Sequence, residues 1–170
     1  MPLGGMMKIG KTMEKALNGQ LNSELYSYYL YLAMAAHFEQ KNLKGIASWL
    51  EKQAGEEQMH AMKIYKYIVD RDGEVSLAAI AAPPATWKAA LDAFVAAYAH
   101  EQKVSRLFDA LVVEARKSQD YTTEVFLHWF VSEQVEEEAS TKEIVDKLRL
   151  AKDSSAALFM LDAELGKRQN

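Results

Sequence analysis

Hydrophobic residues recur every three to four positions along four long stretches of the chain, which is the spacing that places them on one face of a helix. Prolines occur at positions 2, 83 and 84 alone, so residues 3–82 and 85–170 contain none that would interrupt a helix. Alternating runs of β-branched residues, which would indicate strands, are short. The pattern predicts an all-α protein.

Turn and capping residues divide these stretches into helices. A left-handed Gly73 is expected to end the second helix, Thr86 to cap the third, and Asp120 or Thr122 to cap the fourth. Four long helices with short, long and short connections are typical of a four-helix bundle with one crossover, here followed by a short fifth helix. The expected helices lie at about residues 9–39, 43–71, 87–117, 121–150 and 154–166, with the crossover connection at 72–86.

The 170 residues are enough for a sizeable core, and we expect residues 1–170 to form a single domain. The absence of cysteine excludes disulfides, thiolate zinc sites and iron–sulfur clusters. A net charge of -4 argues against nucleic acid as a partner. No secretory signal and no uninterrupted apolar span is seen, so the sequence predicts a cytoplasmic protein without a membrane partner.

Polar side chains interrupt the hydrophobic face of each long helix near its middle. A single offset of 77 residues relates those of the first two helices to those of the next two. The two helical hairpins are therefore quasi-repeats, and the repeat is preserved at the polar interruptions. In chain order these are Glu24, Glu57 and His60, matched by Glu101, Gln134 and Glu137.

The predicted turns place these side chains at one level of the bundle. Glu24 lies 17 residues before Lys41, at the first turn, and Glu57 lies 16 residues after it. At a rise of about 1.5 Å per residue, both lie about 25 Å from the turn. The second hairpin repeats this relation about its own turn, so the polar positions can meet in a common layer.

Several buried carboxylates without a counter-charge would be strongly destabilising, and no lysine or arginine lies on the same helix faces. A bound cation resolves this conflict. Glu57 and His60 share a helix face at i and i+3. A donor set of carboxylates with one imidazole and no sulfur suits Fe(II) or Mn(II), and Zn(II) can also bind.

These residues resemble the signature of the di-iron carboxylate bundles, in which two helices each supply a glutamate and a third supplies Glu-x-x-His. The symmetric form has a second Glu-x-x-His, where this chain has Gln134-Val135-Glu136-Glu137. That departure argues against a bacterioferritin-like or ribonucleotide-reductase-like site and resembles the non-haem ferritins of prokaryotes. The similarity covers essentially the whole chain and includes the segments LNSELYSYYLYLAM, EEQMHAMK, AHEQ and HWFVSEQVEEEAS.

The resemblance implies a ferritin-like di-iron centre with a role for each ligand. Glu24 and His60 would ligate one iron, and Glu57 would bridge the pair. Glu101 would hold the second iron, and Glu137 would complete that position or lie beside it.

The resemblance also assigns residues around the centre. Gln134 would orient a bound water or oxygen species, and Tyr31, one heptad after Glu24, matches the central tyrosine of the family and would donate an electron. The acidic residues that resemble ligands of a third iron site are Glu56, Glu133 and Glu136.

The implied function is iron storage and detoxification. Fe(II) would be oxidised by O₂ in a ferroxidase reaction, and the Fe(III) would be deposited as mineral inside a hollow homo-oligomer, by resemblance a cage of 24 subunits. The predicted fifth helix presents Leu158, Phe159 and Leu161 on an apolar face that has no place on a finished four-helix bundle, which indicates a subunit interface.

Other interpretations of single residues stay open. Tyr31 lies in an aromatic stretch with Tyr28 and Tyr29, and plain packing explains it about as well as electron donation. Glu133 and Glu136 can also form a solvated acidic face, although the third-site interpretation is modestly favoured.

Other functions also compete with iron storage. A di-metal oxidase or peroxidase of the rubrerythrin type would favour a second histidine motif or a cysteine-rich iron domain, and neither is present. A structural bundle would leave the acidic core without basic partners. A DNA-binding miniferritin is disfavoured because no basic tail is present.

Overall fold

The computed structural model describes residues 8–169, which form helices and no strands. The all-α fold agrees with the prediction from the sequence. None of the helices in this range is both long and apolar enough to cross a membrane. The helices are α1 (Lys11–Gln40), α2 (Lys44–Asp70), α3 (Ala90–Lys117), α4 (Tyr121–Ala151) and α5 (Ser155–Leu165).

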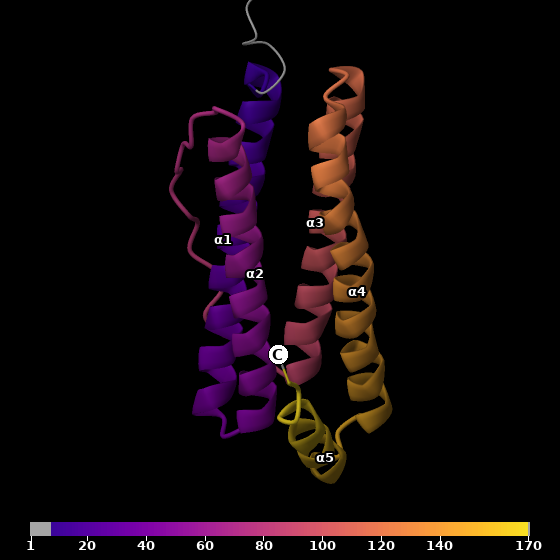
Figure 1. Cartoon of the computed structure of the whole chain (residues 1–170). Coiled ribbons are helices and arrows are strands. Elements are labelled where there is room, and N and C mark those ends of the chain that lie inside the picture. The colour runs from indigo at the N-terminus through magenta and orange to yellow at the C-terminus, as the bar shows by residue number, and fades with distance from the viewer. Residues whose placement is uncertain (1–7, 170) are drawn as a thin grey trace, which may run out of the picture.

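The four long helices form two antiparallel hairpins, α1 with α2 and α3 with α4, which stand side by side (Figure 1). The connection at 71–89 returns along the first hairpin, so α3 begins at the end of the bundle where α2 began (Figure 1). Asn18 of α1 holds this connection, because its side chain donates to the Glu74 carbonyl at 2.9 Å and accepts from the Ser76 amide at 2.7 Å. The topology is the predicted bundle with one crossover.

Two of the predicted helix boundaries are wrong in detail. The left-handed residue after α2 is Asp72, with φ of 54°, and not Gly73. Aspartate tolerates this conformation because its short polar side chain can bond locally. The third helix begins at residue 90 and not 87, because the carboxylate of Asp92, rather than Thr86, serves its start by accepting the N-cap N–H at 3.1 Å.

The caps of the last two helices are side-chain caps. Asp120 accepts the Thr123 N–H at 3.1 Å and so caps α4, as the sequence predicts. Ser154 accepts the Ala157 N–H at 3.2 Å at the start of α5. Each bond satisfies an N–H that the first turn of a helix leaves free.

Two hydrophobic clusters fill the bundle. The cluster that includes residues of α5 also contains Met34, Leu50, Phe94 and Leu148. The other cluster contains Leu17, Ile64, Phe108 and Phe130. Along each long helix, buried polar residues separate the positions that belong to one cluster from those that belong to the other. The bundle therefore carries a polar layer between two apolar regions.

The short helix α5 packs at the end of the bundle against the start of α2 (Figure 1). Gly45 makes this approach possible, since a Cβ at that position would lie 1.7 Å from the carbonyl oxygen of Asp162. The Asp162 carboxylate also accepts the Ile46 N–H at 2.8 Å. Phe159 and Met160 remain 69% and 75% exposed, so the expected apolar face of this helix is only partly covered.

Candidate metal centre

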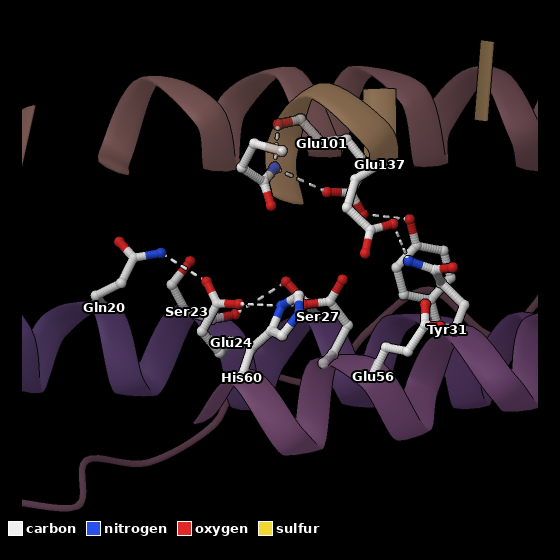
Figure 2. A network of polar contacts seen from close by, with 12 residues as sticks. Gln20, Ser23, Glu24, Ser27, Tyr31, Glu56, His60, Glu101 and Glu137 are labelled. Atoms are coloured by element: carbon white, nitrogen blue, oxygen red, sulfur yellow. Dashed lines mark hydrogen bonds and ion pairs between the residues drawn. The ribbon is translucent and has the colours of Figure 1, made fainter. Parts of the chain in front are cut away.

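The polar layer brings together all six positions of the internal repeat. They come from every long helix, each is buried, and together they are Glu24, Glu57, His60, Glu101, Gln134 and Glu137. Figure 2 shows Glu24 and His60 reaching from the first hairpin toward Glu101 and Glu137 of the second. The common level that the residue spacing predicts is therefore present in the fold.

The ligating atoms form two groups that share one residue. Glu24, Glu57 and His60 place one atom each within 4.8 Å of one another. Glu57, Glu101 and Glu137 do the same. Since Glu57 belongs to both groups, its carboxylate is the one that can connect two neighbouring cations.

The first group contains buried atoms whose bonding capacity is unused. His60 Nδ1 lies 3.4 Å from Glu24 Oε2 and 3.5 Å from a carboxylate oxygen of Glu57. Within the described residues, Glu24 Oε2, Glu57 Oε1 and His60 Nδ1 are the buried side-chain atoms that lack a hydrogen-bond partner. Buried polar atoms are normally satisfied, and a divalent cation would satisfy these three at once. The residues present therefore fit a metal ion.

Two glutamines hold the carboxylates around these atoms. Gln20 donates to Glu24 Oε1 at 2.6 Å, and Gln53 donates to Glu137 Oε2. Neither was assigned a role from the sequence. For Gln20 the signal was present, because it lies one helical turn before Glu24 on the same face.

Aromatic rings fix the imidazole of His60. Its ring meets Trp129 and Phe130 of α4 edge-on, with centroids 5.4 Å and 5.8 Å apart. The Lys63 ammonium lies over the face of the Trp129 ring, 3.6 Å from the ring centre. This packing limits the orientations that His60 can adopt, and no residue spacing indicates that Trp129 lies beside the site.

The second group is held by neutral donors. Tyr31 donates its hydroxyl to Glu101 Oε1, and Gln134 donates to Glu101 Oε2 at 3.1 Å. The backbone carbonyl of Glu137 accepts from Thr141 at 2.7 Å, one turn further along α4. Gln134 is thus engaged with a carboxylate of the centre through its amide nitrogen.

Burial changes the proton affinity of the acidic residues. It raises the pKa of Glu101 to about 7, raises the pKa of Glu137 to about 8 with help from the Glu101 charge, and raises the pKa of Glu57 well above its usual range. Burial would lower the pKa of His60, but the adjacent carboxylates of Glu24 and Glu57 outweigh it and raise that pKa to about 11. Without a metal ion the layer therefore keeps protons that a cation would displace.

Comparison with known proteins agrees with this geometry. Residues 14–151 match the family model described as a Ferritin-like domain. A bacterial non-heme ferritin of Bacteroides fragilis is 41% identical over 160 residues, which are 94% of this chain and 99% of that protein. A bacterial non-heme ferritin of Staphylococcus aureus is 39% identical over 94% of this chain and 96% of its own length. This chain belongs to the ferritin family.

A solved structure gives the same result for the fold. The open pore ferritin of the hyperthermophilic archaeon Archaeoglobus fulgidus superposes with a TM-score of 0.94 at 46% identity, covering 95% of this chain and 100% of that chain. Iron storage is thus the function of this ferritin, as the sequence predicts. The rubrerythrin-like alternative is not favoured.

Tyr31 of this ferritin is more than a packing residue. Its side chain is fully buried, and its hydroxyl donates directly to Glu101. Burial and the nearby Glu101 charge raise the pKa of Tyr31 well above its usual range, so the phenol keeps its proton. Tyr31 therefore makes a polar contact with a candidate ligand in addition to its packing, and electron donation stays a prediction.

The three residues expected at a third iron site lie less close together than the residues of the two groups of candidate ligands. Glu56 and Glu133 are partly exposed and Glu136 is exposed, and in the described part of the ferritin none of them joins a group of ligand atoms within 4.8 Å. They line a pocket of about 290 Å³ between α2 and α4, beside Glu137. Glu56 is paired with Arg168, whose Nη2 lies 2.6 Å from Glu56 Oε2.

Two of the remaining histidines of this ferritin, His100 and His37, are engaged elsewhere. His100 shares a 2.7 Å hydrogen bond with Ser27, and burial lowers its pKa to about 4, so it is neutral. His37 packs edge-on against Trp87 with centroids 5.6 Å apart. Neither residue joins the groups of candidate ligands.

Proposed function

We propose that this ferritin is a ferroxidase that oxidises two Fe(II) ions with O₂ inside each subunit. The observation that carries the proposal is the shared position of Glu57 between two groups of buried ligand atoms. Iron is the substrate, each Fe(II) gives up one electron, and the redox chemistry is that of the metal. The chain contributes positions that hold two ions close together and away from bulk water.

Each side chain of the layer has a part in this proposal. Glu24 and His60 bind the first ion, Glu101 and Glu137 bind the second, and Glu57 connects them. The four carboxylates offset the positive charge of two Fe(II) ions, which explains why they tolerate one another when buried. Gln134 adds no charge beside the second ion, and a neutral amide that binds metal weakly would leave room there for O₂.

Gln134 and Tyr31 act beside the ions in the proposed reaction. The Gln134 amide holds Glu101 and can turn toward a bound water or oxygen species. The Tyr31 hydroxyl contacts a ligand of the second ion, and this contact supports a role in supplying an electron to the centre.

The oxidised iron is proposed to leave the layer for a mineral held inside a homo-oligomer. The exposed apolar residues of α5, Phe159 and Met160, support an interface with further copies of the chain. A closed cage of 24 subunits in the cytoplasm is the assembly we propose, with Fe(II) and O₂ as substrates and a third iron site at Glu56, Glu133 and Glu136 on the route from the centre.

One experiment tests the proposed function. Metal-free protein is mixed aerobically with excess Fe(II), and the ferric absorbance and sedimentation are followed against a protein-free control. Soluble ferric cores with many iron ions per chain are expected. Oxidation that stops after two or three ions per chain would indicate an oxidase without storage. Oxidation no faster than the control would contradict the ferroxidase assignment.

A further inference from the structure

Arg168, in the segment after α5, places a guanidinium in the pocket where the third iron ion is proposed to bind. The pocket is lined by acidic side chains of α2 and α4, and Arg168 is its basic lining residue. Arg168 Nη2 donates to Glu56 Oε2 at 2.6 Å. One of the three acidic residues expected to bind a third ion is therefore already paired with a cation that belongs to the chain.

Several contacts with α2 fix the position of this guanidinium. Nη1 donates to Gln53 Oε1 at 3.0 Å and to the Trp49 carbonyl at 3.4 Å, and the guanidinium carbon lies 4.7 Å from the centre of the Trp49 ring. The carbonyl of Arg168 accepts from Lys52. Residues 49, 53 and 56 follow one face of α2, so Arg168 lies along that face and not loosely in solvent.

The packing of α5 against the start of α2 determines the position of Arg168. Gly166 lies directly against Gly45, because a Cβ on Gly166 would lie 3.1 Å from the Gly45 Cα. The Asp162 bond to the start of α2 holds the same helix. The position of the terminal segment is thus set by the same contacts that hold α5.

Arg168 is also linked to the second metal position. A guanidinium can only donate hydrogen bonds, so the Gln53 oxygen faces Arg168 and the Gln53 NH₂ group must face the other way. That group donates to Glu137 Oε2. The guanidinium therefore sets the orientation in which Gln53 holds a carboxylate of the di-iron centre.

We propose that Arg168 is a tethered cation that competes with a third metal ion for Glu56, so that the third ion binds only when the terminal segment releases that carboxylate. The inference rests on the proposed function, because it takes the pocket at Glu56, Glu133 and Glu136 as the third iron site. The Arg168 and Glu56 side chains are 22% and 38% exposed, and an ion pair so open to solvent is weak enough for a divalent ion to displace. Release of Arg168 also frees Gln53 to turn away from Glu137.

Binding of Zn(II) to the assembled metal-free protein, followed by titration calorimetry, tests the competition. Arg168→Gln removes the charge, Arg168→Lys keeps it, and Lys167→Ala removes a positive charge from the exposed neighbouring position. We expect Arg168→Gln to tighten binding of the third Zn(II) by about three- to fivefold, the upper part of the range for removing a partly exposed ion pair. Arg168→Lys and Lys167→Ala are expected to stay within about twofold of the parent protein.

The outcomes separate this inference from the proposed function. Two tight Zn(II) ions with a third whose affinity is unchanged or weaker in Arg168→Gln would overturn the role of Arg168 alone, as would the absence of a third ion in every variant. A parent protein that does not bind the first two Zn(II) ions would overturn both the proposed function and this inference.

Crystals of the parent protein soaked in Zn(II) supply a second readout. Anomalous density for a third ion beside Glu56 should coincide with a displaced Arg168. A third ion that coexists with an intact Arg168–Glu56 pair would overturn the competition.

Discussion

Gln134 donates its side-chain amide to Glu101 over 3.1 Å, at the two positions that correspond in the internal repeat to Glu24 and Glu57. The first hairpin thus has two carboxylates where the second has a carboxylate and an amide. This difference removes one negative charge from the buried layer and gives Glu101 a donor in place of a repelling neighbour.

Restoring the symmetry should destabilise the metal-free protein. Gln134→Glu replaces the donor to Glu101 with a second buried acid, so we expect the free energy of unfolding to fall by about 1–3 kcal/mol without metal and to recover when Zn(II) is added. Thermal unfolding with and without Zn(II) measures both. Equal stability of the metal-free variant and parent would mean that the charge count of the layer does not limit the fold. Gln58→Glu, which adds the same charge at an exposed position of α2, is the matched control.

Much of this site could be predicted from the sequence because helices are regular. The 77-residue offset and the constant rise of a helix place Glu24, Glu57 and Glu101 at one level, and the structure finds them within a single layer. Periodicity also predicts the all-α class and the crossover.

Contacts between distant segments could not be predicted in the same way. The bond from Tyr31 to Glu101 and the return of Arg168 to Glu56 depend on how hairpins and α5 pack, and no spacing rule reports that. The predicted start of α3 was wrong for a local reason. Thr86 and Asp92 can each hydrogen-bond to the backbone at the start of a helix, and the packing of the connection decides which of them does so.

Loss of the shared carboxylate should be more damaging than loss of the imidazole. Glu57→Ala removes a ligand from both groups and is expected to bind neither ion of the centre tightly, whereas His60→Ala should lose only the first. Both should slow initial Fe(II) oxidation by more than about 100-fold, since even outer-shell partners of a metal typically contribute 10–100-fold. Zn(II) stoichiometry and initial rates measure these effects.

The control for this pair is Glu51→Ala, on the exposed face of the same helix. It should bind and oxidise as the parent does, and circular dichroism should show unchanged helix content in all three variants. Normal initial rates in both Glu57→Ala and His60→Ala would rule out the assigned centre.

Metal binding should release protons in a pH-dependent manner. Below their raised pKa values of about 7 and about 8, the Glu101 and Glu137 carboxyl groups hold protons that a cation must displace. The number of protons released per Zn(II) should therefore fall as the pH rises through 7 to 8, and the apparent affinity should rise over the same range. Calorimetry in buffers of different ionisation enthalpy counts the protons. A proton count that does not change between pH 6 and pH 9 would contradict the assignment of these groups.

Removing the Tyr31 hydroxyl separates its two roles. Tyr31→Phe keeps the buried ring but leaves Glu101 Oε1 without its donor, so we expect binding of the second Zn(II) to weaken by up to about tenfold. If Tyr31 also supplies an electron, oxidation should remain slower than in the parent when Fe(II) is saturating. Tyr29→Phe, on the exposed side of α1, is the control. A Tyr31→Phe variant with parental affinity and parental rate would show that the hydroxyl serves neither purpose.

A methyl group at Gly45 should dislodge α5 and with it the assembly. The added Cβ would lie 1.7 Å from the Asp162 carbonyl oxygen, so Gly45→Ala must separate α5 from α2 and is expected to cost about 1–3 kcal/mol of stability. Gly55→Ala is the matched control, because nothing lies within 4 Å of a Cβ there, and alanine in a helix should add up to about 1 kcal/mol. Light scattering should show a large oligomer for the parent and for Gly55→Ala and smaller species for Gly45→Ala. A parent protein that is monomeric at working concentration would contradict the proposed cage, and a fully assembled Gly45→Ala would show that α5 does not hold it together.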